Sequence, residues 1–317
     1  MSIEAKLEAF LGRSVDGFKP LSHGWETEVY GCYIQGAPTV LRLYHGENVA
    51  VRAETEFRMM RHLGRLGYPV PRVDRYEADP AIFGGPFLIM EGIEGQPLGD
   101  FLDRRQETVE QLCRLMFDLH RLDPDSFIGV DGVWPDLTTA EGTFANRFWL
   151  DLCRSLDLAA PVQPLFAWLE EQGRSVAFRR APVHSDLHFE NVLVRADGSA
   201  VVIDWGSTGI ADPRYDLAYV YMLMRTQGAS VLAEQIRTTY ESIAGPQADW
   251  EYFFTWALIR RLVVMLIVLV RGSAAIGLRP GLEGQLRQNL DYIRLVCGMV
   301  ADRTGLDLTL IDELLRG

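Results

Sequence analysis

The first ninety residues alternate between hydrophobic patterns typical of strands and of helices. Two runs rich in Val, Tyr, Ile and Leu, 28–34 and 39–44, flank a turn-forming sequence at 35–38, which predicts a β-hairpin. Apolar residues then recur at helical spacing over 52–66, and two prolines soon afterwards end the predicted helix. A further strand is predicted over 87–90.

A glycine-punctuated stretch, 91–95, follows that strand and connects two parts of the chain with different patterns. Beyond it the pattern is mainly helical, with helical segments at 108–122, 144–157, 212–243 and 249–270. We therefore predict an α+β protein with two lobes. The first, 1–92, has a small antiparallel sheet and one helix, and the second, 93–317, is larger and mainly helical.

Composition narrows the possible functions. The 317 residues include 31 basic and 43 acidic side chains, a net charge of −12, which argues against partners such as nucleic acid or an anionic membrane surface. The longest apolar run, 262–270, is about half of a bilayer crossing, and we interpret it as a buried helix. The N-terminus lacks the apolar run of a secretory signal, and four widely spaced cysteines indicate buried thiols in a cytoplasmic protein.

A dense polar cluster stands within strand-like sequence. His184, Asp186 and Asn191 precede one apolar run, and Asp204 follows another. The Asp-Gly pair between the two runs is typical of a tight hairpin. Because Asn191 precedes the first strand and Asp204 ends the second, antiparallel pairing places both side chains at the same end. Asp186 is expected to point a carboxylate toward the same opening.

The chemistry implied by these oxygens is phosphoryl transfer. Carboxylate and amide oxygens without nearby thiolates suit Mg²⁺, which binds mainly through substrate phosphates. In that reaction one Asp orients the acceptor hydroxyl while other residues hold the metal against the nucleotide. The spacing H-x-D-x-x-x-x-N followed by D-x-G supplies these roles in order. A transition-metal site at His184, Asp186 and His188 is a minor alternative, since no further His or Cys lies nearby.

On these motifs the sequence resembles the aminoglycoside phosphotransferase and choline kinase family, small-molecule kinases with a protein-kinase-like fold. The resemblance is strongest over 183–220. It implies Asp186 as the catalytic base or the residue that orients the acceptor hydroxyl, Asn191 and Asp204 as Mg²⁺ ligands, and ATP or GTP as co-substrate. It implies structural roles for His184, which braces the loop, and for Asp216, which braces the catalytic loop from the following stretch.

The resemblance also implies a nucleotide site in the first lobe. Arg42 stands where such kinases place a strand-borne cation, and Glu56 matches its helical partner, so the two are expected to form an ion pair. Further nucleotide contacts are implied for residues of the covering loop and of the connection between the lobes, namely Ser22, Gly24, Glu91 and Ile93.

The sequence departs from the family pattern at three places. Most relatives have Lys where this chain has Arg42, and a planar, longer cation changes the phosphate geometry. The covering loop has one glycine, Gly24, where protein kinases use three. Ser185 replaces a common glycine, a small change that we expect to be tolerated.

The acceptor is the least constrained part of the prediction. Between Glu91 and Asp157 the sequence has 14 acids and 6 bases, which favours a cationic acceptor only modestly over a neutral sugar or alcohol. A nucleotide-binding protein with weak or no catalysis is an alternative, which Arg42 and the glycine-poor loop leave open. A protein kinase is disfavoured because eight positions from Asp204 to Asp212 leave no room for an activation segment.

Overall fold

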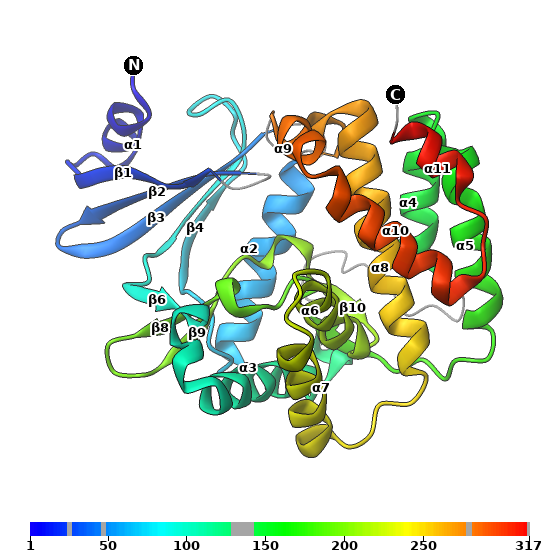
Figure 1. Ribbon diagram of the computed structural model, residues 1–317. Helices are drawn as coiled ribbons and strands as arrows, with labels where there is room; N and C mark the ends of the chain where they lie inside the picture. Colours follow the sequence, from blue (N-terminus) through cyan, green and yellow to red (C-terminus); the bar gives the residue numbers. More distant parts are fainter. Residues whose placement is uncertain (24–26, 46–48, 128–142, 277–280, 316–317) are drawn as a thin grey trace.

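The computed structural model describes residues 1–23, 27–45, 49–127, 143–276 and 281–315. Its N-terminal part is a five-stranded antiparallel sheet in the order β1-β2-β3-β5-β4. The strands are β1 (Asp16–His23), β2 (Thr27–Ile34), β3 (Ala37–Tyr44), β4 (Val73–Glu77) and β5 (Phe87–Glu91). The hairpin predicted from 28–34 and 39–44 is confirmed as β2 and β3. Figure 1 shows this sheet with helices α1 (Ile3–Leu11) and α2 (Val49–Arg65).

Alternation along the strands decides which side chains face the active site. On β3, Leu41 and Leu43 pack in a small cluster with Leu7 of α1. The alternate residue Tyr44 joins the main core, which also contains the buried face of α2. Because neighbouring strand residues point to opposite faces, Arg42 lies on the α2 side of the sheet, where it contacts Glu56.

The segment that connects the two parts passes close to the backbone of other segments at two glycines. A Cβ atom on Gly92 would lie 2.9 Å from the Pro38 carbonyl carbon, and one on Gly95 would lie 2.6 Å from the Val194 carbonyl oxygen. Glycine is therefore required at both positions. The predicted lobe boundary near residue 92 follows the last residue of β5 and stays a prediction.

Two small sheets follow the connection. Strand β6 (Gly95–Pro97) pairs with β8 (Val192–Arg195), which pairs in turn with β9 (Ala200–Val202). Strand β7 (Ala181–Val183) pairs with β10 (Gly209–Ala211). We call the first of these, β6-β8-β9, the ribbon.

The second part is mainly helical, which confirms the predicted α+β, two-lobed class. Its helices are α3 (Arg105–His120), α4 (Thr143–Ser155), α5 (Ala159–Gly173), α6 (Arg214–Thr226), α7 (Ser230–Ala244), α8 (Trp250–Arg271), α9 (Leu282–Gln288), α10 (Leu290–Thr304) and α11 (Thr309–Leu314). Short 3-10 helices are η1 (Leu98–Arg104), η2 (Pro124–Phe127), η3 (Phe189–Asn191), η4 (Trp205–Ser207) and η5 (Ser273–Ile276). The predicted helical segment 212–243 is two helices, because the chain turns between α6 and α7 at Gly228, with φ 82°.

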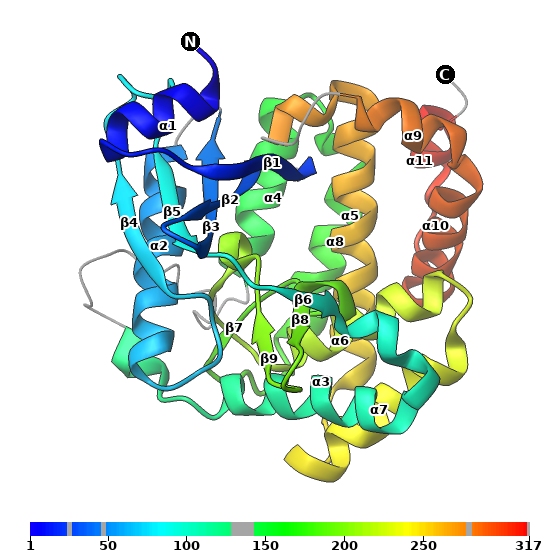
Figure 2. The same cartoon turned by 90° about the vertical axis from the view of Figure 1, so that its left-hand side faces the viewer.

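Helix α8 is the core of the helical part. It packs against α5, α6 and α10, and Figure 2 shows it running through the middle of the helices. By length and composition alone it could cross a membrane, but 78% of its apolar window is buried inside the protein. That burial agrees with the interpretation of 262–270 as part of a buried helix.

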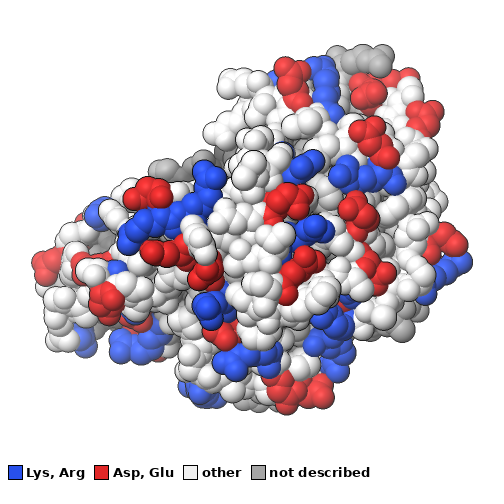
Figure 3. Space-filling model, turned by 60° about the horizontal axis from the view of Figure 1, so that its bottom comes forward, with Lys and Arg blue, Asp and Glu red and all other residues white. Residues whose placement is uncertain are grey.

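Acidic and basic side chains are mixed on the face shown in Figure 3, where no large patch of one sign is visible. Among the described residues, three acids of the 91–157 segment have basic partners from other elements: Glu91 pairs with Arg195, Asp125 with Arg180 and Asp157 with Arg271. The acid surplus of that segment is therefore partly neutralised where it stands.

Candidate active site

The loop between β7 and β8 is held from below by one buried carboxylate. Asp216, on α6, accepts hydrogen bonds from the backbone N–H of His184 at 2.9 Å and of Ser185 at 2.6 Å. His120, at the end of α3, contacts the same carboxylate at 3.0 Å. Ser185 has φ +65°, a left-handed conformation that glycine adopts more readily, so the fixed amide groups hold a serine where relatives have glycine.

His184 is placed as a brace for the same loop. Its Nε2 lies 2.9 Å from the Ile203 carbonyl oxygen, and its ring packs on Trp205 with centroids 4.6 Å apart. The imidazole is fully buried. It therefore links the loop to the end of β9 and does not reach solvent.

Asp186 and Asn191 face each other across this loop. The Asn191 Nδ2 donates to the Asp186 backbone oxygen at 2.9 Å and lies 3.4 Å from its carboxylate Oδ2. His188 Nε2 lies 3.6 Å from Asp186 Oδ1. Burial lowers the pKa of His188 in spite of the Asp186 charge, so this imidazole is neutral near pH 7. Since the Asn191 amide nitrogen holds the loop, its Oδ1 is left for a cation.

The β8-β9 hairpin brings Asp204 to the same end as Asn191. Val192 pairs with Val202, and the Ile203 N–H donates to the Asn191 carbonyl oxygen at 2.9 Å. Gly198, with φ 84°, forms the turn at the far end. The expected meeting of Asn191 and Asp204 is thus confirmed by the strand register. Asp204 itself has φ 66°, and its side chain is 48% exposed.

Arg42 joins the sheet, α2 and the hairpin. One guanidinium nitrogen lies 3.3 Å from Glu56 Oε1, and another lies 2.8 Å from Asp204 Oδ1. The ion pair expected between Arg42 and Glu56 is confirmed. The second contact was not expected, and it follows from the planar fork of arginine, which can bond two carboxylates at once. Glu56 also accepts from the Tyr44 hydroxyl at 2.6 Å.

Burial and charge set the protonation of these acids. Burial raises the pKa of Glu56 above its ordinary value, and Arg42 offsets part of the rise. Packing around Asp204 by itself raises its pKa, but the charge of Arg42 and its hydrogen bond more than compensate, so the pKa lies below the ordinary value. Asp204 is therefore ionised at neutral pH, as a metal ligand must be.

The other residues predicted to contact the nucleotide lie in different parts of the structure, and their role stays a prediction. Glu91 uses its carboxylate to bond Arg195 at 2.6 Å and the Arg72 N–H at 3.1 Å, so its side chain ties β5 to the ribbon. Ile93 follows Glu91 in the connection, outside the ladders of both sheets. Ser22 lies in β1, and Gly24 lies outside the described residues.

Several contacts of the site join residues far apart in the sequence, and the sequence pattern missed them. Tyr219, on α6, lies next to Asp186, and its pKa rises to about 12, mainly through burial and then through the Asp186 charge. Arg260, on α8, donates to the Ser185 carbonyl oxygen at 2.7 Å. His120, at the end of α3, is the partner of Asp216. The aromatic residues of α8, from Trp250 to Trp256, are buried in the core.

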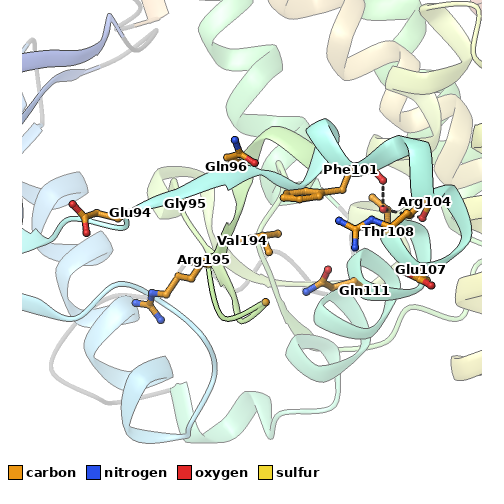
Figure 4. Close-up of a pocket in the computed structure, with 12 residues that line it drawn as sticks. Glu94, Gly95, Gln96, Phe101, Arg104, Glu107, Thr108, Gln111, Val194 and Arg195 are labelled. Carbon is orange, nitrogen blue, oxygen red and sulfur yellow. Dashed lines mark hydrogen bonds between the residues drawn. The ribbon is translucent and has the colours of Figure 1, made fainter.

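A separate surface hollow of about 620 Å³ lies between the ribbon, η1 and α3. Figure 4 shows the Phe101 ring and the Gln111 side chain reaching from the helices toward the ribbon. The Thr108 hydroxyl donates to the Phe101 carbonyl oxygen at 2.6 Å. None of Asp186, Asn191 and Asp204 lines it, so it is distinct from the candidate active site.

The oxygen donors fit a hard divalent cation. Asp204 has one carboxylate oxygen on Arg42 and a half-exposed side chain. Asn191 lies at the same end of the β8-β9 hairpin, and its amide nitrogen is next to Asp186. Within the part of the chain that the structure describes, no group of three His, Cys, Asp or Glu side chains could hold a metal ion by itself. Two protein oxygens completed by phosphates and water are typical of Mg²⁺.

The family follows from comparison with known proteins. Residues 17–251 match the model of the phosphotransferase enzyme family. This span contains the sheet, the ribbon, the loop with Asp186 and helices α6 and α7. The chain belongs to the phosphotransferase enzyme family.

Solved structures of similar fold cover almost the whole chain. A thermostable mutant of aminoglycoside phosphotransferase APH(4)-Ia, in ternary complex with ADP and hygromycin B, has a TM-score of 0.65 at 19% identity and covers 96% of this chain and 98% of that one. Aminoglycoside-3'-phosphotransferase of type VIII has a TM-score of 0.61 at 21% identity, with 81% and 98% covered. At these identities the likeness shows a shared fold.

Curated relatives are longer proteins. Acyl-CoA dehydrogenase family member 10 of Mus musculus is 26% identical over 246 residues, which are 69% of this chain and 22% of that protein. Acyl-CoA dehydrogenase family member 11 of Gallus gallus is 23% identical over 238 residues, or 68% and 30%. The chain thus spans less than a third of the length of these relatives.

Proposed function

We propose that the chain transfers the γ-phosphoryl group of ATP or GTP to a hydroxyl of a small molecule. The observation that supports this most directly is the convergence of Arg42, Glu56 and Asp204 opposite the loop with Asp186 and Asn191. These side chains come from three separate elements, and a merely structural ion pair does not require two further oxygen donors at the same opening.

In this proposal each residue has a defined task. Arg42, held by Glu56, binds nucleotide phosphate, and Asp204 and Asn191 hold Mg²⁺. When bound, the cation neutralises charge that develops on the phosphates. Asp186 orients the acceptor hydroxyl and accepts its proton. The acceptor oxygen then forms a bond to the γ-phosphorus while the bond from that phosphorus to the β–γ bridging oxygen breaks, which releases ADP or GDP.

The neighbouring structures support the choice of co-substrate and acceptor class. One of them was solved with ADP and hygromycin B, and another with AMP-PNP and hygromycin B. A protein substrate is disfavoured because η4 and β10 fill the stretch from Asp204 to Asp212, and β10 is paired with β7. This leaves no long segment to position a peptide.

The test is an acceptor screen that follows nucleotide consumption. The purified chain is incubated with Mg²⁺ and ATP or GTP and with aminoglycosides, amino alcohols, sugars, diols and hydroxy acids. We expect acceptor-dependent release of diphosphate and a phosphorylated acceptor of 80 Da higher mass, a difference of one HPO₃ group. The Asp186→Asn variant is the matched control. Nucleotide binding without transfer to any acceptor would favour the non-catalytic alternative.

A further inference from the structure

Two adjacent arginines lie in the middle of the most apolar helix of the protein. Arg260 and Arg261 interrupt α8, whose flanking residues, from Trp256 to Ile259 and from Leu262 to Val263, are buried. Charged side chains within such a helix are unfavourable unless they are paired with an opposite charge, hydrogen-bonded or bound to a ligand. Their surroundings therefore indicate what they bind.

Arg260 is fixed against the loop that bears Asp186. It donates to the Ser185 carbonyl oxygen at 2.7 Å, and its guanidinium stacks over the ring of Tyr219 at 4.9 Å and of Trp256 at 5.8 Å. Tyr219 in turn lies next to Asp186. The guanidinium thus packs against two aromatic rings, one of which is next to the proposed catalytic residue.

Arg261 shares the same surroundings. It lies over the ring of Tyr292 at 5.7 Å, donates a hydrogen bond to the Tyr292 hydroxyl, and interacts electrostatically with Tyr219 and Asp186. Its Nε is buried without a hydrogen-bond partner. Both arginines are only partly buried, so part of each side chain is accessible to a ligand.

The contrast with other buried arginines is informative. Arg214 bonds both oxygens of Asp212, at 2.8 and 2.7 Å, and Arg42 bonds two acids. Among the described residues neither Arg260 nor Arg261 forms an ion pair with a carboxylate. Arg261 thus feels the charge of Asp186, but neither arginine has a described carboxylate at ion-pair distance, as Arg214 has in Asp212.

We propose that the acceptor alcohol carries an oxyanion, a carboxylate or a phosphate, which Arg260 and Arg261 bind while Asp186 holds its hydroxyl. This rests on the proposed phosphotransfer and names its substrate class. Planar guanidinium groups match carboxylate and phosphate oxygens, and two of them repel an ammonium group. The acid surplus of 91–157 favoured a cationic acceptor, but no described contact joins an acid of that segment to Arg260 or Arg261.

The first experiment measures anion binding without any transfer. Inorganic sulfate is titrated by calorimetry into the chain saturated with Mg²⁺ and ADP, so that Arg42 is already occupied. We expect sulfate binding that is lost in Arg261→Gln and retained in Arg303→Gln. Arg303, on α10, is the control, since it too stacks on an aromatic ring and has an Nε without a hydrogen-bond partner, but it pairs with Glu251 at 3.8 Å. No binding, or equal binding in both variants, overturns the proposal.

The second experiment measures transfer to acceptors that share one carbon skeleton. Phosphorylation of 3-hydroxybutyrate, 1,3-butanediol and 4-amino-2-butanol is compared, together with larger hydroxy acids, diols and amino alcohols matched in the same way. We expect the anionic members to react best. Arg261→Gln should raise their KM about 10- to 100-fold, as expected for a lost charged hydrogen bond, with a smaller effect in Arg261→Lys. The KM of the neutral diols should change less than about twofold.

The outcomes separate this inference from the proposed function. Efficient transfer to amino alcohols or neutral diols, with Arg261→Gln unchanged, supports phosphotransfer and refutes the anionic acceptor. Sulfate binding that depends on Arg261, without transfer to any acceptor, supports the anion site and refutes the phosphotransferase. Unchanged thermal unfolding of Arg261→Lys shows that an effect of this variant is not a loss of fold.

Discussion

The strongest energetic prediction concerns Arg42, which joins three elements through two carboxylates. Its side chain is 12% exposed, and its partner Glu56 is 2% exposed. In Arg42→Ala, the Glu56 carboxylate remains buried with a hydrogen bond from the Tyr44 hydroxyl and the more distant charge of Arg52. Removing one partner of a buried ion pair typically costs about 3–5 kcal/mol. We expect a loss of this size in the free energy of unfolding, measured by urea denaturation.

Two variants show whether the fork of the arginine matters. Arg42→Lys retains the charge, but an ammonium group cannot bond Glu56 and Asp204 in the same bidentate manner, so we expect a loss of about 1–3 kcal/mol. Arg58→Ala is the control, because Arg58 pairs with Glu54 within one exposed helix turn. That pair should contribute about 0.3–0.5 kcal/mol.

The pH dependence tests the cause. The Glu56 pKa lies above its ordinary value of 4.5 in the wild type, and losing Arg42 must raise it further. A carboxyl with a raised folded pKa binds more protons when folded, so its contribution to stability falls as pH rises above the unfolded value. The deficit of Arg42→Ala should therefore shrink when pH is lowered toward 4.5. A deficit below 1 kcal/mol, or one that grows on acidification, would refute this account.

The other predictions address the remaining roles. Arg42→Ala should raise the ATP KM far more than Arg42→Lys does; equal effects would remove Arg42 from phosphate binding. Asp186→Ala should lower turnover about 100-fold or more with nearly unchanged nucleotide affinity, and an unaffected rate would exclude it from the mechanism. Asp204→Ala should weaken binding of the metal-nucleotide complex in calorimetry, and unchanged affinity would contradict its role. Asp216→Ala, which leaves buried N–H groups unpaired, should destabilise the fold by about 3–5 kcal/mol, against less than 0.5 for the exposed Asp291→Ala. Burial raises the Asp216 pKa, but His120 and the amide groups lower it below 3.8 overall. The stabilisation by the Asp216 carboxylate should therefore be lost only as the pH falls through that lowered value. Measuring the free energy of unfolding at decreasing pH checks this.

Elements defined by local patterns could be predicted from the sequence. The β2-β3 hairpin follows from two apolar runs and the turn at Gln35 and Gly36, both with positive φ. Strand β1 was missed because its sequence contains Gly17 and Pro20, and its pairing with β2 has register irregularities that break the alternation. The break between α6 and α7 was also missed, since one glycine does not end a helical pattern by itself.

The candidate site shows the same division between local and distant information. The proximity of Asn191 and Asp204 could be predicted because they lie at the two ends of one tight hairpin. Contacts of Asp216 with His120 and of Arg42 with Asp204 join residues 96 and 162 positions apart. No periodicity relates such pairs, so only the packed structure could show them. The roles of these residues toward a nucleotide stay predictions.

One signal of the acceptor was nevertheless present in the sequence. Arg260 and Arg261 directly precede the apolar run 262–270, which was predicted to be a buried helix. A helix that packs on α5, α6 and α10 has little surface for solvated charge, so adjacent arginines within it must find partners in the interior. The structure supplies aromatic faces, the Ser185 carbonyl oxygen, the Tyr292 hydroxyl and the charge of Asp186, but no described carboxylate at ion-pair distance, which is consistent with the oxyanion proposed above. The same reasoning predicts that Arg260→Gln and Arg261→Gln both weaken sulfate binding, while a variant of a paired arginine such as Arg195→Gln does not.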